Sequence, residues 1–444
     1  MSFSHSPTAR KPHTSTLWRV NVFLKRRSHN FMAWSMSKFW AAYKLPPSHP
    51  ESIHPAFLNA MCLYGCSYGP SSTRVYEPLF YARLQRSLAD CLASADRLHD
   101  FMRASALAAV YCFHRKRYAV GQNHLAATIH LAVACGLDKI DSCDVSSASI
   151  SRLLRSPRDA TDLGDMIHTW WGLFCMDRIA STLLECPTTI PENDDVITTI
   201  WPCKFEDYAS GQAIHAAYSG TASLRTPPGD LTIAVSVYEN VYAFRAKSVG
   251  LLFHTMTLTP SHQERNVDQI RDTRITIDVA SRLSEIMVAY RQEMCPTFSC
   301  TRYCENDGHD STLIFAMTTC YTALIRLLTV SADKDQGSYQ RRLKIARDCV
   351  ALGAEAYSTD PHLAAPCIVF AWCASYEVFA WEVVRLNKLG EGEAATAALL
   401  EVEAAMNLIR RLVQIFETFK KKWPVQNLQR FNIHKAELAK WSKH

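Results

Sequence analysis

Glycine is scarce in this sequence, with 15 among 444 residues. Few glycines leave few positions for the tight turns that join neighbouring β-strands. No stretch alternates apolar and polar residues for long enough to predict a half-buried strand. The sequence therefore predicts an all-α fold, a large multi-helix domain of antiparallel helices. At this length we expect two subdomains or one long helical array.

The motifs of the common nucleotide-binding enzymes are also missing. The chain contains neither Gly-x-Gly-x-x-Gly nor Gly-x-x-x-x-Gly-Lys-Ser/Thr. Its 17 histidines are dispersed, and His124 and His130, six residues apart, do not share a helix face. We therefore predict no catalytic residue and no cofactor, and we expect that the protein is not an enzyme. The alternative, an α-helical enzyme, would depend on Asp177 for turnover.

Cys-x-x-Cys is absent, because no two of the 16 cysteines are three positions apart. This argues against most zinc fingers and ribbons. Most cysteines lie singly in apolar segments, which is typical of reduced, buried thiols. The densest group is Cys295, Cys300 and Cys304 with His309, whose spacing could bring four ligands to one metal. It matches no known pattern, so we favour an ordinary loop with free thiols and predict no metal site.

Acidic residues are absent from residues 1–50, which contain eight lysines and arginines. Taking these eight charges from the net charge of +6 leaves about −2 on the rest of the chain. A nearly neutral body offers no basic face for phosphate, so DNA binding by this chain alone is not expected. Residues 1–16 are predicted to be a disordered basic arm, either a targeting signal or the remnant of a linker.

Long apolar runs are absent as well. The start of the chain lacks the run of a secretory signal, which favours a reducing compartment, the cytosol or the nucleus. A transit peptide is an alternative reading of the acid-free arm. The nearest approach to a membrane span is residues 364–386, which are interrupted by Glu377, Glu382 and Arg385. Charges are costly at bilayer depth, so we expect a buried core helix and no membrane contact.

Apolar residues at helical spacing predict helices along most of the chain. In the helix predicted at 76–95, one face is expected to carry Leu79, Phe80, Leu84, Leu88 and Leu92. The irregular stretch 192–229 divides the chain into an N-terminal helical part, 17–210, and a C-terminal helical part, 211–444. The predicted helices are one or two within 17–43, then 56–64, 76–95, 98–113, 122–135, a short one at 149–154, one carrying Trp170, and 231–258, 271–291, 311–330, 339–357, 363–387 and 394–420.

Trp170 and Trp171 identify the helix around which we expect the fold to be packed. Adjacent side chains point about 100° apart on a helix, so both indoles are buried only if the helix is packed on more than one side. The neighbouring charges, Asp177 and Arg178, lie among apolar residues and need partners. We interpret them as a structural clasp between this helix and the loop after Pro187, with the acidic loop Asn193-Asp194-Asp195 as a further partner for Arg178.

The helix predicted at 122–135 ends at Gly136 and Leu137, which fit a left-handed cap and its apolar contact. It belongs to a series of short motifs, which are the stretches at 23–29, 46–50, 54–60, 81–83, 127–137 and 170–178, and the pair Cys186-Pro187. In order and spacing these motifs resemble the fungal-specific transcription factor domain, the regulatory middle region of zinc binuclear-cluster transcription factors. The resemblance covers roughly Val22 to Arg291.

The resemblance implies an all-helical regulatory domain that acts in the nucleus through the transcription machinery or co-regulators. It leaves open a homodimer and a small-molecule effector. In such proteins DNA is bound by a separate six-cysteine zinc cluster. The family pattern begins here by about residue 20, and residues 1–16 contain no cysteine, so we expect that cluster, and its zinc, to be missing from this chain. The alternative function is a helical-repeat scaffold, suggested by the helix pair at 98–135.

Overall fold

The computed structural model describes residues 15–184, 186–191, 197–215, 240–258, 267–294, 309–332, 335–359 and 368–415. These residues form fourteen α-helices joined by loops and short 3-10 turns, and none of them forms a β-strand. The predicted all-α class is therefore confirmed. Residues 1–14 of the basic arm predicted at 1–16 lie outside the described residues, whereas Ser15 and Thr16 cap and begin the first helix and so are not disordered.

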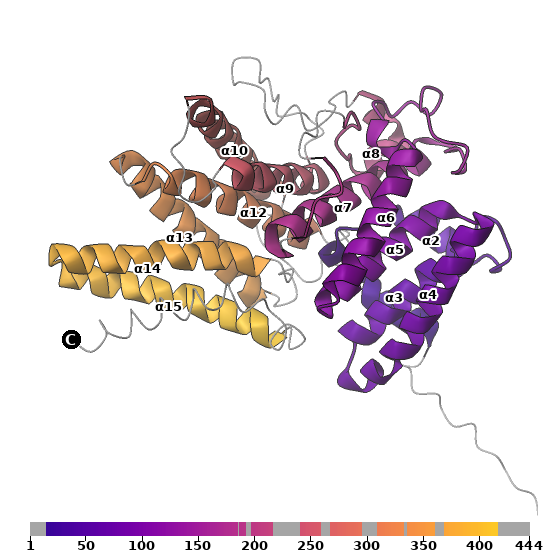
Figure 1. Cartoon of the computed structure of the whole chain (residues 1–444), viewed down its shortest axis with the longest axis horizontal. Coiled ribbons are helices and arrows are strands. Elements are labelled where there is room, and N and C mark those ends of the chain that lie inside the picture. The colour runs from indigo at the N-terminus through magenta and orange to yellow at the C-terminus, as the bar shows by residue number, and fades with distance from the viewer. Residues whose placement is uncertain are drawn as a thin grey trace, which may run out of the picture.

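The first half of the chain forms α1 to α8, which group on one side of the molecule in Figure 1. Helices α3, α4 and α5 pack against one another, and α6 packs on α5. The helices are α1 (Thr16–Leu24), α2 (Met36–Tyr43), α3 (Pro55–Tyr68), α4 (Glu77–Ser94), α5 (Leu98–His114), α6 (Tyr118–Ala134), α7 (Ala160–Leu184) and α8 (Phe205–Ser210), with 3-10 turns η2 (Arg27–Asn30), η3 (Ser71–Tyr76) and η4 (Leu137–Lys139).

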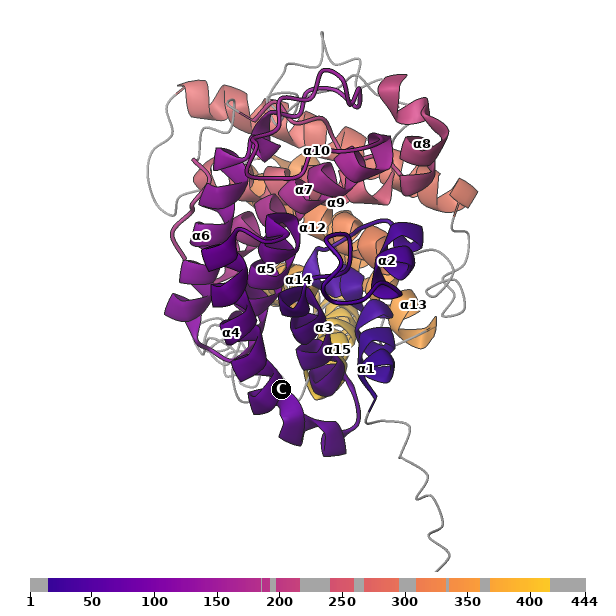
Figure 2. The ribbon, with the colours of Figure 1, turned by 90° about the vertical axis from the view of Figure 1, so that its right-hand side faces the viewer.

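The second half forms longer helices, of which α14 and α15 make an antiparallel pair at the far end from α3 and α4 (Figure 1). Figure 2 shows α12, α14 and α15 behind the helices of the first half. Helix α9 packs on both α7 and α12, and so joins the two halves. The helices are α9 (Val241–Leu258), α10 (Val267–Met294), α12 (His309–Thr329), α13 (Gln336–Thr359), α14 (Val369–Leu389) and α15 (Gly392–Ile415), with a turn η6 (Gln212–His215).

The helix ends follow from local chemistry. Ser15 and Ser35 accept hydrogen bonds from the backbone at the starts of α1 and α2, as N-cap serines do. Pro55 stands in the first turn of α3, where its missing N–H is not needed. Gly136 and Gly390, both at positive φ, follow the last turns of α6 and α14. The Gly136 cap is where the sequence places it.

Two predicted features are wrong. Residues 149–154 form turns, not a helix, and the backbone N–H of Ser151 instead donates to Cys135 at the end of α6. In α4, Leu79 and Leu92 are 46% and 54% exposed. Phe80, Leu84 and Leu88 form the buried face together with Cys91, which lies closer to their direction on the helix than Leu92 does.

A segment near the N-terminus ties the two halves together. Phe31, which has a positive φ of 59°, packs edge-on against Phe315 of α12 with ring centroids 5.4 Å apart. Its carbonyl accepts a hydrogen bond of 2.9 Å from Arg245 of α9. The same carbonyl lies 2.9 Å from where a Cβ would stand on Gly172 of α7, so a larger residue there would displace this segment.

Among the described residues, Asp310–Thr329 is the one helix long and apolar enough to cross a membrane, with a mean hydropathy of 1.4. This is not the stretch 364–386 that the sequence suggests. The most apolar part of Asp310–Thr329 is 89% buried inside the protein, where α9, α10 and α13 pack against this helix. Buried core helices of this kind can be as long and as apolar as helices that span a membrane.

The close approach of α1 and α3 is tested by Gly65→Ala. A Cβ on Gly65 would stand 2.3 Å from the carbonyl oxygen of Arg19, so α1 must shift, and we expect a loss of about 1–3 kcal/mol in unfolding free energy. The matched control is Gly392→Ala, since nothing lies within 4 Å of a Cβ there. Urea unfolding measures both, and an equal effect of the two changes would contradict the packing.

Candidate functional site

Helix α7 carries the two adjacent tryptophans, and the structure buries both. Trp171 is 1% exposed, and its indole N–H donates to the carbonyl of Ile200 over 2.7 Å. Its ring stacks on Trp201 with centroids 4.2 Å apart and planes 24° apart. The ammonium of Lys247 lies 5.5 Å from the centroid of the Trp201 ring. Trp171 thus fixes residues 200–201 against α7.

Trp170 is equally buried on another side of the same helix. Its indole nitrogen has no hydrogen-bond partner among the described residues, so its contribution is apolar packing. The burial of both indoles fits a helix that is packed on more than one side. That the whole fold is arranged around this helix stays a prediction.

Asp177 holds the loop that follows α7. One carboxylate oxygen accepts from the backbone N–H of Thr189 at 2.9 Å and the other from that of Ile190 at 3.2 Å. Burial raises the pKa of Asp177, while these two donors and the Arg178 guanidinium act to lower it. Because both oxygens accept N–H bonds, the site is built for the ionised carboxylate.

Arg178 holds the same loop through the opposite chemistry. Its guanidinium donates to the carbonyls of Ile190 at 2.9 Å and Pro191 at 2.7 Å, and one nitrogen lies 3.5 Å from the Asp177 carboxylate. The guanidinium carbon lies 4.2 Å from the centroid of the Phe253 ring of α9. The acidic residues 193–195, predicted as a partner of Arg178, lie outside the described residues.

The loop at 186–191, which we call the clasp loop, also reaches α6. The Pro187 carbonyl accepts a hydrogen bond of 2.7 Å from the side chain of Gln122. Cys186 is buried, and its N–H donates to Ala180 of α7. The clasp loop therefore fixes α6 relative to the end of α7.

A second segment, 197–203, pairs with the chain that follows Gly136. The side chain of Thr199 donates to the carbonyl of Leu137 at 2.6 Å, and it accepts from the N–H of Ile140 at 3.1 Å. Leu137 itself is fully buried. Gly136 and Leu137 thus direct the chain from α6 into contact with the segment that Trp171 holds.

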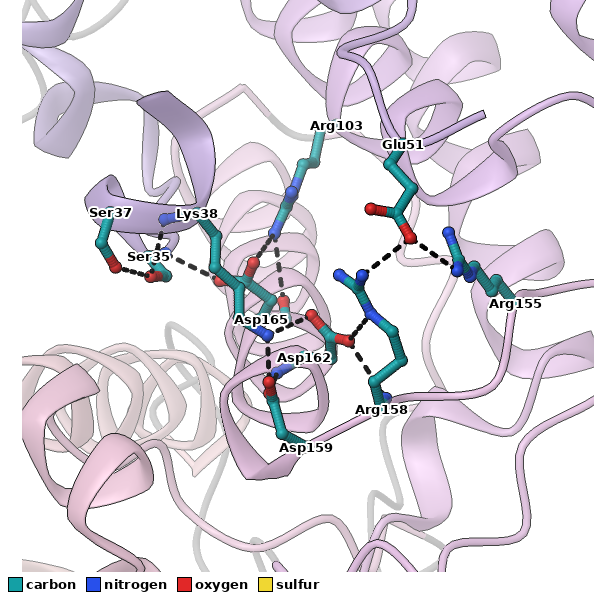
Figure 3. A network of polar contacts seen from close by, with 10 residues as sticks. All are labelled: Ser35, Ser37, Lys38, Glu51, Arg103, Arg155, Arg158, Asp159, Asp162 and Asp165. Atoms are coloured by element: carbon teal, nitrogen blue, oxygen red, sulfur yellow. Dashed lines mark hydrogen bonds and ion pairs between the residues drawn. The ribbon is translucent and has the colours of Figure 1, made fainter. Parts of the chain in front are cut away.

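A polar network covers the start of α7, as Figure 3 shows. Lys38 of α2 forms ion pairs with Asp159, at 2.6 Å, and with Asp162. Burial would raise the pKa of Asp162, but hydrogen bonds from Arg158 and Lys38 outweigh it and lower the pKa to about 2. Arg158 also bonds Glu51. Residues 35–51 are therefore anchored to the N-terminal turn of α7.

The inner part of this network is buried. Asp165 accepts from the backbone N–H of Ser35 at 2.8 Å and lies 3.4 Å from the guanidinium of Arg103 in α5. Sequence reasoning missed these residues, although Arg158 and Asp162 stand four apart at a helix start. Their partners lie 62 to 130 residues away in the chain, where no local pattern points to them.

A short motif at the end of α3 matches a pattern that is known from serine hydrolases. Residues 65–69 read Gly-Cys-Ser-Tyr-Gly and match the Gly-x-Ser-x-Gly pattern of serine hydrolases. That pattern works where a serine stands on a sharp turn between a strand and a helix. Here it lies on the last turn of α3, so Ser67 lacks that geometry.

Within the described residues, no three His, Cys, Asp or Glu side chains lie close enough together to hold a metal ion. The predicted cysteine group at 295–304 lies outside those residues. Helix α7 offers a set of polar and stacking contacts, most of them buried, that position three separate segments of the chain. That arrangement suits a structural or regulatory element of an all-α protein.

Residues 20–233 match the model of the fungal specific transcription factor domain. This part of the chain is therefore a fungal specific transcription factor domain. The matched range includes all of α7 and the clasp loop. It ends at residue 233, whereas the motifs in the sequence suggested a resemblance as far as Arg291. No curated protein and no solved structure matches the chain.

The packing of Trp171 is tested by Trp171→Ala, which should lower the unfolding free energy by about 3–5 kcal/mol because it empties a fully buried site. The matched control is Trp381→Ala, since Trp381 is 59% exposed. Chemical denaturation measures both. A loss under about 1 kcal/mol for Trp171→Ala, the range of surface changes, would contradict the role of α7 as a packed core helix.

The clasp is tested by Asp177→Asn, which removes a buried charge and leaves Arg178 uncompensated. We expect a loss of about 3–5 kcal/mol, the usual cost of breaking a buried pair from one side. The control is Asp141→Asn at an exposed position. If thermal and denaturant unfolding show the same small effect for both variants, the pair does not hold the clasp loop.

Proposed function

We propose that this domain regulates transcription in the nucleus through contacts with the transcription machinery or its co-regulators. The match over residues 20–233 supports this proposal most directly. DNA would be bound through a zinc cluster that these 444 residues do not supply, since they contain no Cys-x-x-Cys. A catalytic role is not part of the proposal.

The packing around α7 suggests how a signal would act. Three separate segments, 35–51, 186–191 and 197–203, contact this helix through hydrogen bonds or ion pairs. A protein partner or small-molecule effector that shifts one of them changes the contacts of the other two, because all three share the same helix. Regulation of this kind requires no movement of a whole domain. A change in the contacts between these segments and α7 is enough.

The proposal is tested by fusing residues 1–444 to an unrelated DNA-binding domain in a fungal host. We expect reporter expression to change several-fold relative to that DNA-binding domain alone, upward or downward. The Trp171→Ala fusion should return to the baseline, whereas Leu153→Ala, at an exposed position, should behave as the unaltered chain. Immunoblots of each fusion correct for differences in protein level.

Two results together would overturn the proposal. The first is reporter expression equal to that of the DNA-binding domain alone at matched protein level. The second is a tagged chain that stays outside the nucleus and recovers only cytoplasmic partners in a pull-down. That outcome would favour a helical scaffold, for which the packed pair of α5 and α6 is the structural basis.

A further inference from the structure

Two arginines before the start of α7 converge on a single carboxylate oxygen. Oε1 of Glu51 lies 2.7 Å from a guanidinium nitrogen of Arg155 and 2.8 Å from one of Arg158 (Figure 3). The hydrogen bond from Arg155 is the main reason why the pKa of Glu51 is lowered. The two guanidinium groups therefore form a small anion-binding site on the surface, and Glu51 occupies it.

Ser156 stands in the chain between these two arginines. Cα atoms two positions apart are separated by at most about 7 Å, so the long side chains of Arg155 and Arg158 both reach a charged group on Ser156. Ser156 is exposed, and its hydroxyl makes no hydrogen bond with any of the described residues. An anion attached to Ser156 would therefore compete with Glu51 for the same two guanidinium groups.

The backbone around Ser156 is open to a protein that binds it. Residues 155–157 form neither helix nor turn, and Pro157 favours an extended conformation of Ser156. Neither Arg155 nor Ser156 makes a backbone hydrogen bond within the part of the chain that the structure describes. In that part of the chain, Ser156 is also the one serine or threonine that precedes a proline. An enzyme that recognises Ser-Pro in an extended chain can thus bind this segment without breaking the fold.

We propose that a proline-directed protein kinase phosphorylates Ser156, and that the phosphate then takes Arg155 and Arg158 from Glu51. The kinase transfers the terminal phosphoryl group of ATP. The bond from that phosphorus to the bridging oxygen breaks, a bond to Oγ of Ser156 forms, and ADP leaves. The proton of the hydroxyl passes to a carboxylate of the kinase.

The charges of this surface decide which contact is lost. Three cations pair with three carboxylates before the modification, and these groups are Lys38, Arg155, Arg158, Glu51, Asp159 and Asp162. Phosphoserine adds a charge of about −2, so one carboxylate loses its partners. Asp162 keeps Lys38 and the backbone N–H of Arg158, whereas the ion pairs of Glu51 among the described residues are those with the two arginines. Exposed ion pairs of this kind are weak, and arginine binds phosphate strongly.

The release of Glu51 would remove one of the contacts that anchor residues 35–51 to the start of α7. The contacts of Ser35 and Lys38 with this helix would remain. The proposal adds an input to the regulatory function proposed above, and it rests on that function only for an effect on transcription. Its tests use no reporter, so the two proposals can fail separately.

The site is tested by incubating the full chain with a purified proline-directed kinase and ATP. Ser6, Thr226 and Thr259 also precede prolines, so they are changed to alanine together. We expect stoichiometric phosphate at Ser156 by mass spectrometry, and none in the further variant Ser156→Ala. The matched control is Ser146, which is exposed but is not followed by a proline, and it should stay unmodified.

The contacts with the two arginines are tested by a phosphorus NMR titration of the phosphorylated chain. The second pKa of free phosphoserine is about 6, and we expect a lower pKa here because the guanidinium groups stabilise the dianion. Arg155→Ala and Arg158→Ala should each raise this pKa, whereas Arg152→Ala, at an exposed position, should leave it unchanged. Glu51→Gln should lower it further, since the carboxylate no longer competes for the arginines.

Circular dichroism confirms that each variant is folded. The proposal is overturned if Ser156 takes up no phosphate in the folded chain, or takes it up only in urea. A phosphate pKa at or above about 6 would also overturn it, since that is the result expected beside the carboxylates of Asp159 and Asp162 without help from the arginines. So would an unchanged pKa in Glu51→Gln, because the phosphate and Glu51 would then not share their partners.

Discussion

A buried ion pair on α7 constrains how the chain continues after this helix. Asp177 and Arg178 are 1% and 0% exposed, and withdrawing each charge from water costs several kcal/mol unless partners replace the solvent. Four backbone groups of residues 189–191 supply those partners. If the clasp loop leaves, these two buried charges lose all four backbone partners and keep only each other. Since the clasp loop also binds Gln122 of α6, the pair sets the position of α6 on α7.

The rest of α7 also holds other parts of the chain in place, through different kinds of contact. At its start, Asp162 and Asp165 hold residues 35–51 through ion pairs and a backbone hydrogen bond. In its middle, Trp171 holds residues 200–201 by stacking and by one hydrogen bond. The first of these segments contains the short helix α2, and the others are loops. In the function proposed above, a signal at one of these segments would reach the others because all of them contact the same helix.

The sequence predicts the helices well, because apolar spacing and caps such as Gly136 act locally. It predicts less well which apolar residues are buried. Leu92 and Cys91 differ by 100° around α4, and the direction of the packing face depends on α3 and α5, not on α4 itself. The pairing of Lys38 with Asp159 could not be predicted, since it joins residues that only the folded chain brings together. The partners of Asp177 are backbone groups, which have no signature in the sequence.

The central claim is that the charges of α7 hold the clasp loop in place. Amide hydrogen exchange at Thr189 and Ile190 tests it most directly, because both amides donate to Asp177 and would exchange rapidly in an ordinary surface loop. The account predicts that these two amides exchange as slowly as those inside α7. Exchange as fast as that of the exposed residues 146 and 147 would contradict it.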